Sequence, residues 1–292
     1  MSLLDKLLGQ FYLQTIIFHR AKQCNTWATD TSGTGLASFH FISSGKAYLH
    51  TNEHQAEELV TGDIVIFPHD AQHWLGSSEH LDTSEPFISF PPENNIPNST
   101  GLMCGYFDFS EDKSHPLLQQ LPQCILIKND DNRGMESSLI HSLIAETERK
   151  GGGNEEIIKR ITEAFFMSIL RTLSDKQESL GFFRALQDNK MRKVLMAIEQ
   201  NIAANWDVSK LAEVGGYSRA SFAQHFKSYI GQSPMEYLTA QRLSQAHKQL
   251  RKGISVFEAA LNAGYQSESA FAKAYKRQFG FGPGASRSFS KD

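Results

Sequence analysis

The sequence predicts an α+β protein of two domains, with a β-rich N-terminal half that ends in helices and an all-α C-terminal domain. Three observations lead to this prediction. Strand-like runs separated by turn residues fill residues 12–110, and helical periodicity begins near Met135. Near the C-terminus, a helix, a glycine turn and a second helix occur twice, about 48 residues apart. A chain of 292 residues is long enough to bury two cores of ordinary size.

The first strand signals are Ser38–Ile42 and Lys46–His50, and Ser43-Ser44-Gly45 between them predicts a hairpin turn. Thr61-Gly62-Asp63 predicts another turn, directly ahead of the β-branched run Ile64–Phe67. Several short strands of this kind are typical of a small barrel or sandwich.

Pro68 ends the run, because proline cannot donate to a strand ladder. Proline and asparagine then predict a long polar loop over Pro86–Gly101, after which Leu102–Phe109 returns to strand.

Two helices are predicted behind the strands. Leu139, Leu143 and Ile144 mark the first, which ends at Gly151-Gly152-Gly153, and Asn154 is the expected cap of the second. The apolar stripe of the second helix is wide enough to serve also as a subunit interface. It consists of Ile157, Ile158, Ile161, Phe165 and Leu170. The polar stretch that follows predicts a linker over 174–189, between a domain at 1–173 and a domain at 190–288.

Composition narrows the class of protein. Hydrophobic residues make up 40% and charged residues 21%, which is typical of a folded globular chain. There is no apolar run of about 18 residues and no apolar core for a signal peptide at the start, so we expect no membrane span and a cytoplasmic location. Cys24, Cys104 and Cys124 lack the paired spacing of a metal site and are expected to be reduced thiols.

Charge is divided unevenly along the chain. Residues 188–292 hold 15 Lys and Arg against 8 Asp and Glu, whereas residues 1–187 hold 14 against 24. The net charges are therefore +7 and −10, although the whole chain carries only −3. A basic C-terminal domain favours a polyanion such as DNA as its partner.

The repeat predicts two helix-turn-helix units, over about 208–229 and 256–279. In the first, Asp207 is the expected cap of a helix at Val208–Val214, Gly215-Gly216 supplies the turn, and Ser218 caps the second helix. Phe222, Phe226 and Tyr229 are expected on the buried face, as are Phe271 and Tyr275 in the second unit.

The opposite faces are expected to meet the major groove of double-stranded DNA. In the first unit this face carries Arg219, Ala220, Ala223, Gln224 and Lys227. In the second it carries Ser267, Glu268, Ser269, Ala270, Lys273 and Lys276.

Three of these side chains suggest specific contacts. The Gln224 amide can pair with adenine N6 and N7. Lys273 suits a guanine or a phosphate, and Glu268 either accepts from cytosine N4 or caps its helix.

Residues 190–288 resemble the paired helix-turn-helix domain of AraC/XylS-type transcription regulators. The first half matches at Leu211-Ala212, Gly216-Tyr217-Ser218, Phe222, Phe226, Gly231, Pro234, Tyr237 and Arg242-Leu243. The second half matches at Ser255-Val256, Ala260, Gly264-Tyr265, Ser267, Phe271, Lys276-Arg277, Gly280 and Pro283. Ala259 and Ser286 stand where the family prefers isoleucine and tyrosine, which predicts looser packing in the second unit.

The N-terminal half resembles the cupin-type sensor domains that precede such DNA-binding domains. Gly62, Pro68 and His73 follow the second cupin motif, and His40 with Gly45 resembles a degraded first motif. The wider resemblance includes Cys104–Phe109, Pro116–Leu118, Leu121-Pro122, Ile158–Arg171 and Phe182–Asp188. It implies a β-barrel that binds a small effector, with following helices that dimerise or relay the signal.

Cupins use two histidines and a carboxylate to hold a metal. Here Ile42 occupies the second histidine position and no glutamate follows at the expected spacing, although His50, His54 and His69 are nearby. We therefore predict neither a metal nor a cofactor. Strand alternation places His40 and Ile42 on one face, and these two with His73 are the expected inward-facing effector residues.

Together these features predict a sequence-specific DNA-binding transcription regulator controlled by a small molecule, and not an enzyme. The expected partners are double-stranded DNA, the effector, RNA polymerase and a second copy of the chain. Two alternatives remain at this stage. One is a metal-dependent cupin enzyme that carries a DNA-binding module, and the other is a constitutive DNA-binding protein whose barrel only dimerises.

Overall fold

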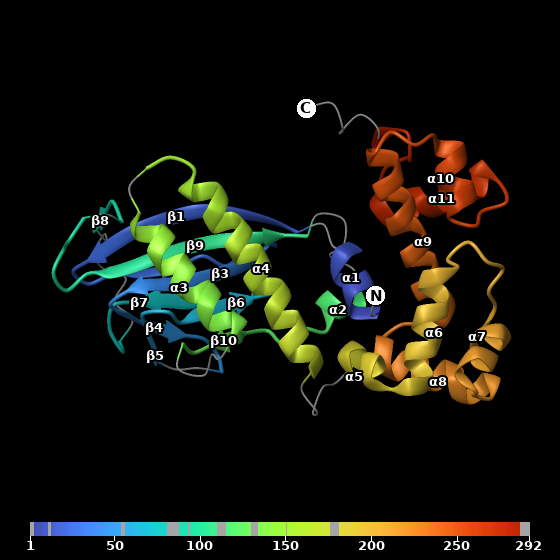
Figure 1. Cartoon of the computed structure of the whole chain (residues 1–292), viewed down its shortest axis with the longest axis horizontal. Helices are drawn as coiled ribbons and strands as arrows, with labels where there is room; N and C mark the ends of the chain where they lie inside the picture. Colours follow the sequence, from blue (N-terminus) through green and yellow to red (C-terminus); the bar gives the residue numbers. More distant parts are fainter. Residues whose placement is uncertain are drawn as a thin grey trace. The chain divides into compact units, whose positions relative to one another are not determined.

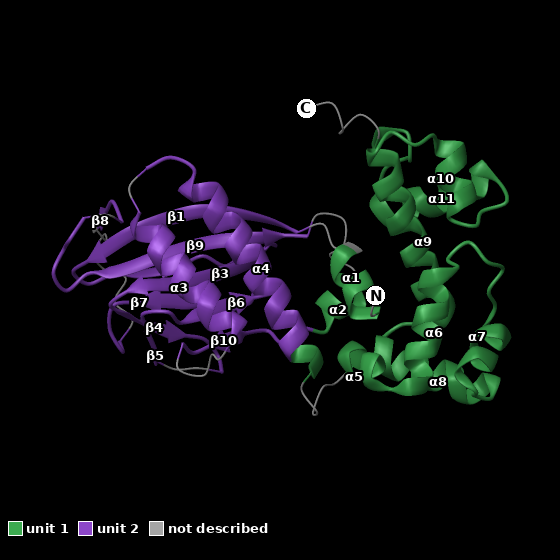
Figure 2. Ribbon diagram, in the orientation of Figure 1, with its two compact units in different colours: residues 1–10, 111–120, 173–292 green, residues 11–110, 121–172 purple. Residues whose placement is uncertain are grey.

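The computed structural model resolves the chain into two compact units (Figure 2). The sheet unit comprises residues 11–110 and 121–172, and the helical unit comprises residues 1–10, 111–120 and 173–292. The structure describes residues 3–10, 13–53, 56–80, 88–92, 94–109, 115–129, 134–149, 151–175 and 181–286. His54, residues 176–180 of the predicted linker and residues 287–288 lie outside this description.

The sheet unit is built from two β-sheets, with strand orders β10-β6-β3-β9-β1-β8 and β2-β7-β4-β5 (Figure 1). The strands are β1 Gln14–Cys24, β2 Ala28–Asp30, β3 Ala37–Ser44, β4 Lys46–His50, β5 Glu57–Val60, β6 Ile64–Phe67, β7 Trp74–Gly76, β8 Ile88–Phe90, β9 Thr100–Asp108 and β10 Ile125–Ile127. Buried side chains of both sheets form one apolar cluster, which includes Ile42 and Leu102 from the larger sheet and Leu49 and Leu75 from the smaller. The core therefore lies between the sheets, as the predicted barrel or sandwich requires.

The predicted hairpin at Ser43-Ser44-Gly45 is wrong. β3 pairs with β6 and β9 in one sheet, whereas β4 pairs with β5 and β7 in the other. The chain changes sheets at Gly45, which adopts a φ of 74°. A Cβ there would lie 2.5 Å from the carbonyl oxygen of Ser99, so this crossing favours glycine.

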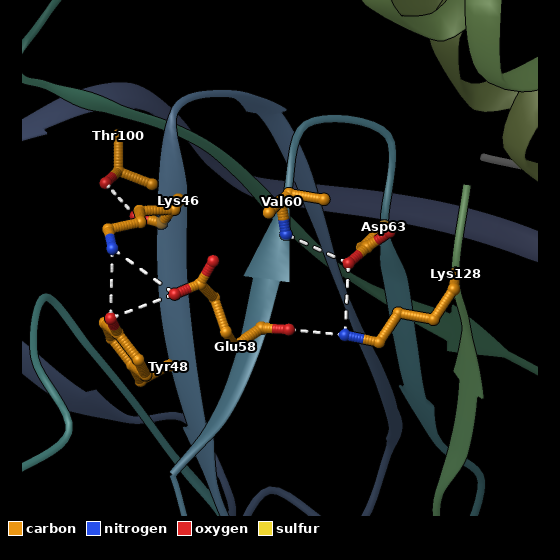
Figure 3. A network of polar contacts seen from close by, with 7 residues as sticks. All are labelled: Lys46, Tyr48, Glu58, Val60, Asp63, Thr100 and Lys128. Atoms are coloured by element: carbon orange, nitrogen blue, oxygen red, sulfur yellow. Dashed lines mark hydrogen bonds and ion pairs between the residues drawn. The ribbon is translucent and has the colours of Figure 1, made fainter. Parts of the chain in front are cut away.

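The predicted turn at Thr61-Gly62-Asp63 is confirmed, and Asp63 holds it together (Figure 3). The buried Asp63 carboxylate accepts from the backbone N–H of Val60 at 2.9 Å and of Asn129 at 2.8 Å, and it lies 3.4 Å from Lys128 Nζ. On the neighbouring strands, Glu58 accepts from the Tyr48 hydroxyl at 3.1 Å (Figure 3).

The loop predicted over Pro86–Gly101 is only partly correct. Ile88–Phe90 forms β8, which pairs antiparallel with β1 at the edge of the larger sheet. A strand of three residues is too short to show alternation in the sequence, and β1 supplies its pairing partner.

Helices α3 (Met135–Glu148) and α4 (Asn154–Asp175) form at the predicted positions, and α3 contacts β3 (Figure 1). The Phe107 ring of β9 lies 4.7 Å from the Phe39 ring of β3 and 4.7 Å from the Phe166 ring of α4. Because Phe39 and His40 point to opposite faces of β3, α4 covers the face opposite His40. Two details differ from the prediction. Ile157 is 42% exposed instead of buried, and Asn154 is the first residue of α4, donating its side-chain N–H to the Arg149 carbonyl.

The helical unit contains α1 Leu3–Gln10, α2 Pro116–Gln119, α5 Gly181–Gln187, α6 Asn189–Gln200, α7 Val208–Gly215, α8 Arg219–Ile230, α9 Pro234–Arg251, α10 Val256–Asn262 and α11 Glu268–Phe279. A capping box between Ser233 and Glu236 starts the long helix α9, which packs against α8, α10 and α11. It therefore joins the two helix-turn-helix units through their cores. No described helix combines the length and apolar composition that a membrane crossing requires.

Candidate nucleic-acid interface and ligand cavity

Helices α7 and α8 form the first helix-turn-helix through local capping. The Asp207 carboxylate accepts from the backbone N–H of Lys210 at 2.9 Å, and the Ser218 hydroxyl accepts from Ser221 at 3.3 Å. Gly216 ends α7 in the left-handed region, with a φ of 66°. These three features agree with the sequence predictions, because each depends on neighbours within a few residues.

The buried side of α8 is aromatic. The rings of Phe222 and Phe226 are fully buried and meet edge to face at 5.5 Å, and Phe226 lies 5.6 Å from Tyr237 of α9. Tyr229, predicted to be in the core, is only half-buried, with the Arg184 guanidinium 5.8 Å from its ring centroid.

The opposite side of α8 is open to solvent. Arg219, Ala220, Gln224 and Lys227 are exposed, and Ala223 is half-buried. His225, which is not among the predicted contacts, is exposed beside them, with its Nδ1 2.8 Å from the Ser221 carbonyl oxygen. If Nδ1 donates to this carbonyl, the ring presents Nε2 outward as an acceptor.

Helices α10 and α11 form the second unit. The Ser267 hydroxyl accepts from the Ala270 N–H at 3.2 Å and is therefore the cap of α11. Glu268 therefore does not cap the helix, which was one of its two predicted roles. Its side chain is exposed in the first turn of α11. The remaining predicted contacts, Ser269, Ala270, Lys273 and Lys276, are exposed, and so is Arg277 of the last turn, which was not selected.

The two residues on which the prediction of looser packing rests lie inside the second unit. Ala259 and Ser286 are both fully buried, and Ala259 belongs to the apolar cluster around Phe271. The Ser286 hydroxyl forms a 2.6 Å hydrogen bond with the Tyr275 hydroxyl, which also bonds Nδ1 of His247. A serine thus completes a buried polar contact at this position.

A cavity of about 150 Å³ lies within the sheet unit. Its lining residues come mainly from β1, β2 and β9 and carry no formal charge apart from what a histidine acquires on protonation. They are Phe18, His19, Gln23, Trp27, Thr29, Thr31, Leu102 and Cys104. The strand register explains the grouping, because Cys104 of β9 pairs with His19 of β1 on one side and with His40 of β3 on the other.

His40 and His73, two of the predicted effector residues, are hydrogen-bonded to Thr31, which lines the cavity. The Thr31 hydroxyl is 3.0 Å from His40 Nε2 and 2.9 Å from His73 Nε2, and the two Nε2 atoms are 2.8 Å apart. His40, Ile42 and His73 are all buried inside the unit, and Ile42 contributes to the apolar core.

Burial keeps these imidazoles neutral. It lowers the pKa of His40 well below its ordinary value, with further lowering from His73 and His19, and it lowers the pKa of His73. The nearby Ala71 carbonyl, 2.7 Å from His73 Nδ1, assigns the proton of the neutral ring to that nitrogen. His73 Nε2 is then the acceptor for His40 Nε2–H.

Most of the cavity wall is not predicted from the sequence. Phe18, His19, Gln23, Trp27 and Thr29 lie in or beside β1 and β2, which carry no motif. The pairing of β1 with β9 brings Phe18, His19 and Gln23 beside Leu102 and Cys104, whereas Thr29 comes from β2 of the smaller sheet.

The histidines do not fit a cupin metal centre. His40 and His73 bond each other directly, and no group of three or more histidine, cysteine or acidic side chains with metal-binding geometry occurs among the described residues. A two-histidine, one-carboxylate site needs a third ligand that these positions do not supply.

Comparison with known proteins gives matches to two families and to full-length relatives. The chain matches the cupin family over residues 2–175 and a helix-turn-helix domain family over residues 211–288. An uncharacterised HTH-type transcriptional regulator of Haemophilus influenzae is 28% identical over 294 residues, which cover 97% of each chain. The HTH-type transcriptional regulator MtrA of Neisseria gonorrhoeae is 26% identical over 312 residues, which cover 98% of each chain. Among solved structures, ToxT from Vibrio cholerae matches 96% of this chain and 98% of its own, with 14% identity and a TM-score of 0.39.

Proposed function

The chain belongs to the AraC family of helix-turn-helix transcription regulators with an N-terminal cupin domain, and from this premise we propose that a small uncharged effector in the cupin cavity controls how α8 and α11 read DNA. In this proposal residues 1–173 form the sensor, 174–189 the linker and 190–288 the DNA-binding domain. The single observation that carries the effector assignment is the cavity beside the Thr31–His40–His73 hydrogen bonds.

On the DNA side, the N-terminal half of α8 enters one major-groove segment and that of α11 the next. Gln224 pairs with an adenine, and Lys227, later on the same face, contacts phosphate. In α11, Lys273 takes a guanine or a phosphate and Glu268 a cytosine amino group. The exposure of all four side chains supports these roles, as does the net charge of +7 over residues 188–292.

The lining of the cavity supports the proposal of an uncharged effector. An ion that entered it would lose its hydration without an opposite charge to replace it, because no Lys, Arg, Asp or Glu lines the cavity. The Phe18 and Trp27 rings offer apolar walls, while Gln23, Thr29 and Thr31 offer hydrogen-bonding groups. A cavity of about 150 Å³ suits a molecule about the size of a six-membered ring.

A panel of ring compounds tests the effector assignment in the full-length protein. Phenol and benzyl alcohol are the uncharged probes, and benzoate is the charged counterpart of similar size. We expect an uncharged probe to raise the midpoint of thermal unfolding and to change the affinity for an operator selected from random duplexes. Thr31→Val should weaken both effects, whereas Thr51→Val, at a half-buried threonine outside the cavity lining, should not. Equal binding of benzoate, or no response to any probe, would contradict the assignment.

A homodimer is the remaining part of the proposal. An open apolar groove on α3 and α4 is lined by Leu139, Ile157, Ile161 and Ala164, with Glu156 and Arg160 at its polar edge. A second copy related by a two-fold axis would bring opposite charges together across this apolar strip. Ile157→Glu should therefore shift the sedimentation coefficient towards that of the monomer.

A further inference from the structure

The short helix α2 (Pro116–Gln119) has an unusual place in the chain. It follows β9, which ends at Asp108, and precedes β10, which begins at Ile125, so in the sequence it lies between two strands of the larger sheet. Nevertheless residues 111–120 belong to the helical unit (Figure 2). β9 is also the strand that contributes Leu102 and Cys104 to the cavity.

Gln120, directly after α2, bonds the ends of two helices with one amide. Its Oε1 accepts from the backbone N–H of Phe182 in the first turn of α5, and its Nε2 donates to the carbonyl oxygen of Tyr229 at 3.1 Å. Tyr229 lies in the last turn of the first recognition helix, α8, whose final carbonyls have no partner within the helix.

A glycine leaves room for this amide. A Cβ on Gly181 would collide with the Gln120 carboxamide, whereas one on Gly231, the left-handed cap of α8, would lie at ordinary contact distance from Gln120 Nε2. The side chain of Gln120 thus sits closely against the start of α5 and the end of α8.

His115, at the other end of α2, meets the same region through packing. Its ring caps α2 and lies edge to face with Phe182 at 5.4 Å. The Phe182 ring is 6.4 Å from Tyr237, and Tyr237 is 5.6 Å from Phe226 of α8. A continuous series of rings therefore leads from α2 into the core of the first helix-turn-helix.

We propose that Gln120 is a positioning residue for DNA recognition, holding the C-terminal end of α8 from a segment that lies between two cupin strands in the sequence. The orientation of α8, and with it the affinity for its half of the operator, depends on this amide. The affinity for the half of the operator that α11 reads does not depend on this amide. The inference rests on the proposed reading of DNA by α8 and is independent of the effector.

Two substitutions separate the two hydrogen bonds of Gln120. Gln120→Glu keeps an acceptor for the Phe182 N–H but loses the donor to Tyr229, whereas Gln120→Met loses both at similar size. Gln119→Met, at the exposed neighbouring position, is the matched control. Each full-length variant is titrated with the selected operator and with two duplexes in which one half-site is scrambled. The half-site that changes specificity in Gln224→Ala is the one assigned to α8.

Losing one hydrogen bond of ordinary strength predicts about a three- to tenfold weaker affinity of Gln120→Glu for the intact operator. The duplex that retains only the α11 half-site should bind Gln120→Glu and wild type equally. Hydrogen exchange gives a readout without DNA. The last turn of α8 should exchange faster in both Gln120 variants than in Gln119→Met, with α11 unchanged.

Three results would count against these ideas in different ways. Wild-type affinity and exchange in Gln120→Glu would overturn the positioning role. Equal loss at both half-sites, with a lower midpoint of unfolding, would overturn it too, because it would indicate general destabilisation. A wild-type protein that selects no sequence at all would remove the proposed function itself.

Discussion

The Nε2 atoms of His40 and His73 lie 2.8 Å apart in the interior of the cupin domain, and the Thr31 hydroxyl lies within 3.0 Å of both. Two imidazoles in such contact cannot both be protonated, since each would lack an acceptor and they would repel. The cavity is therefore backed by a neutral hydrogen-bonded pair in place of a metal or an ion pair.

Stability is expected to fall in mild acid because of this pair. An unfolded histidine has a pKa near 6.5, whereas burial lowers the folded pKa of His40 and His73. Below pH 6.5 the unfolded state binds protons that the folded state excludes, so the free energy of unfolding falls as pH falls. The slope should reach about 1.4 kcal/mol per pH unit for each such histidine.

Urea unfolding at several pH values between 7.5 and 5 measures this slope. His40→Asn should reduce it, whatever its effect on stability at neutral pH. His225→Asn, at an exposed histidine of α8, should leave it as in wild type. An equal slope in His40→Asn and wild type would refute the neutral-pair assignment.

Truncation of Gln224 and truncation of Lys227 are expected to change DNA binding in different ways. Gln224→Ala should reduce discrimination at one base pair by about 1–3 kcal/mol. Lys227→Ala should weaken binding to all sequences alike and reduce the salt slope by about one ion. Titrations of operator and single-base variants at several salt concentrations distinguish these outcomes, and identical behaviour of both variants would contradict the assigned roles.

The hydroxyl of Ser286 is expected to stabilise the second helix-turn-helix. Ser286→Ala removes a 2.6 Å hydrogen bond to the buried Tyr275 hydroxyl, which keeps its bond to His247, so the loss should cost about 0.5–1.5 kcal/mol. Ser269→Ala, at an exposed serine of α11, serves as the control in thermal unfolding. A midpoint for Ser286→Ala equal to that of the control would show that the contact contributes nothing.

Gly216 is expected to tolerate no other residue without strain. Its φ of 66° lies in the left-handed region, where a side chain costs about 1–2 kcal/mol. Gly216→Ala should lower the free energy of unfolding by this amount, whereas Gly284→Ala, with an open Cβ position and no positive φ, should change it little. Denaturant unfolding of the two variants compares them directly.

The sequence by itself determined the parts of this protein that depend on near neighbours. Asp207, Gly216 and Ser218 specify the first helix-turn-helix because caps and left-handed turns act over three or four residues. The buried aromatics at Phe222, Phe226, Phe271 and Tyr275 followed from helical spacing for the same reason.

Tertiary structure decided what depends on distant pairing. Ser43-Ser44-Gly45 resembles a hairpin locally, but its two flanking strands find partners in different sheets. Likewise, nothing within β1 marks Phe18 or Gln23 as cavity residues until β9 lies beside them, and nothing near Gln120 reveals that its amide meets Tyr229. Local sequence limits which backbone conformations are low in energy. Contacts across more than a hundred residues, such as that of Gln120 with Tyr229, form only when the helical unit packs, so they leave no periodic signal in the chain.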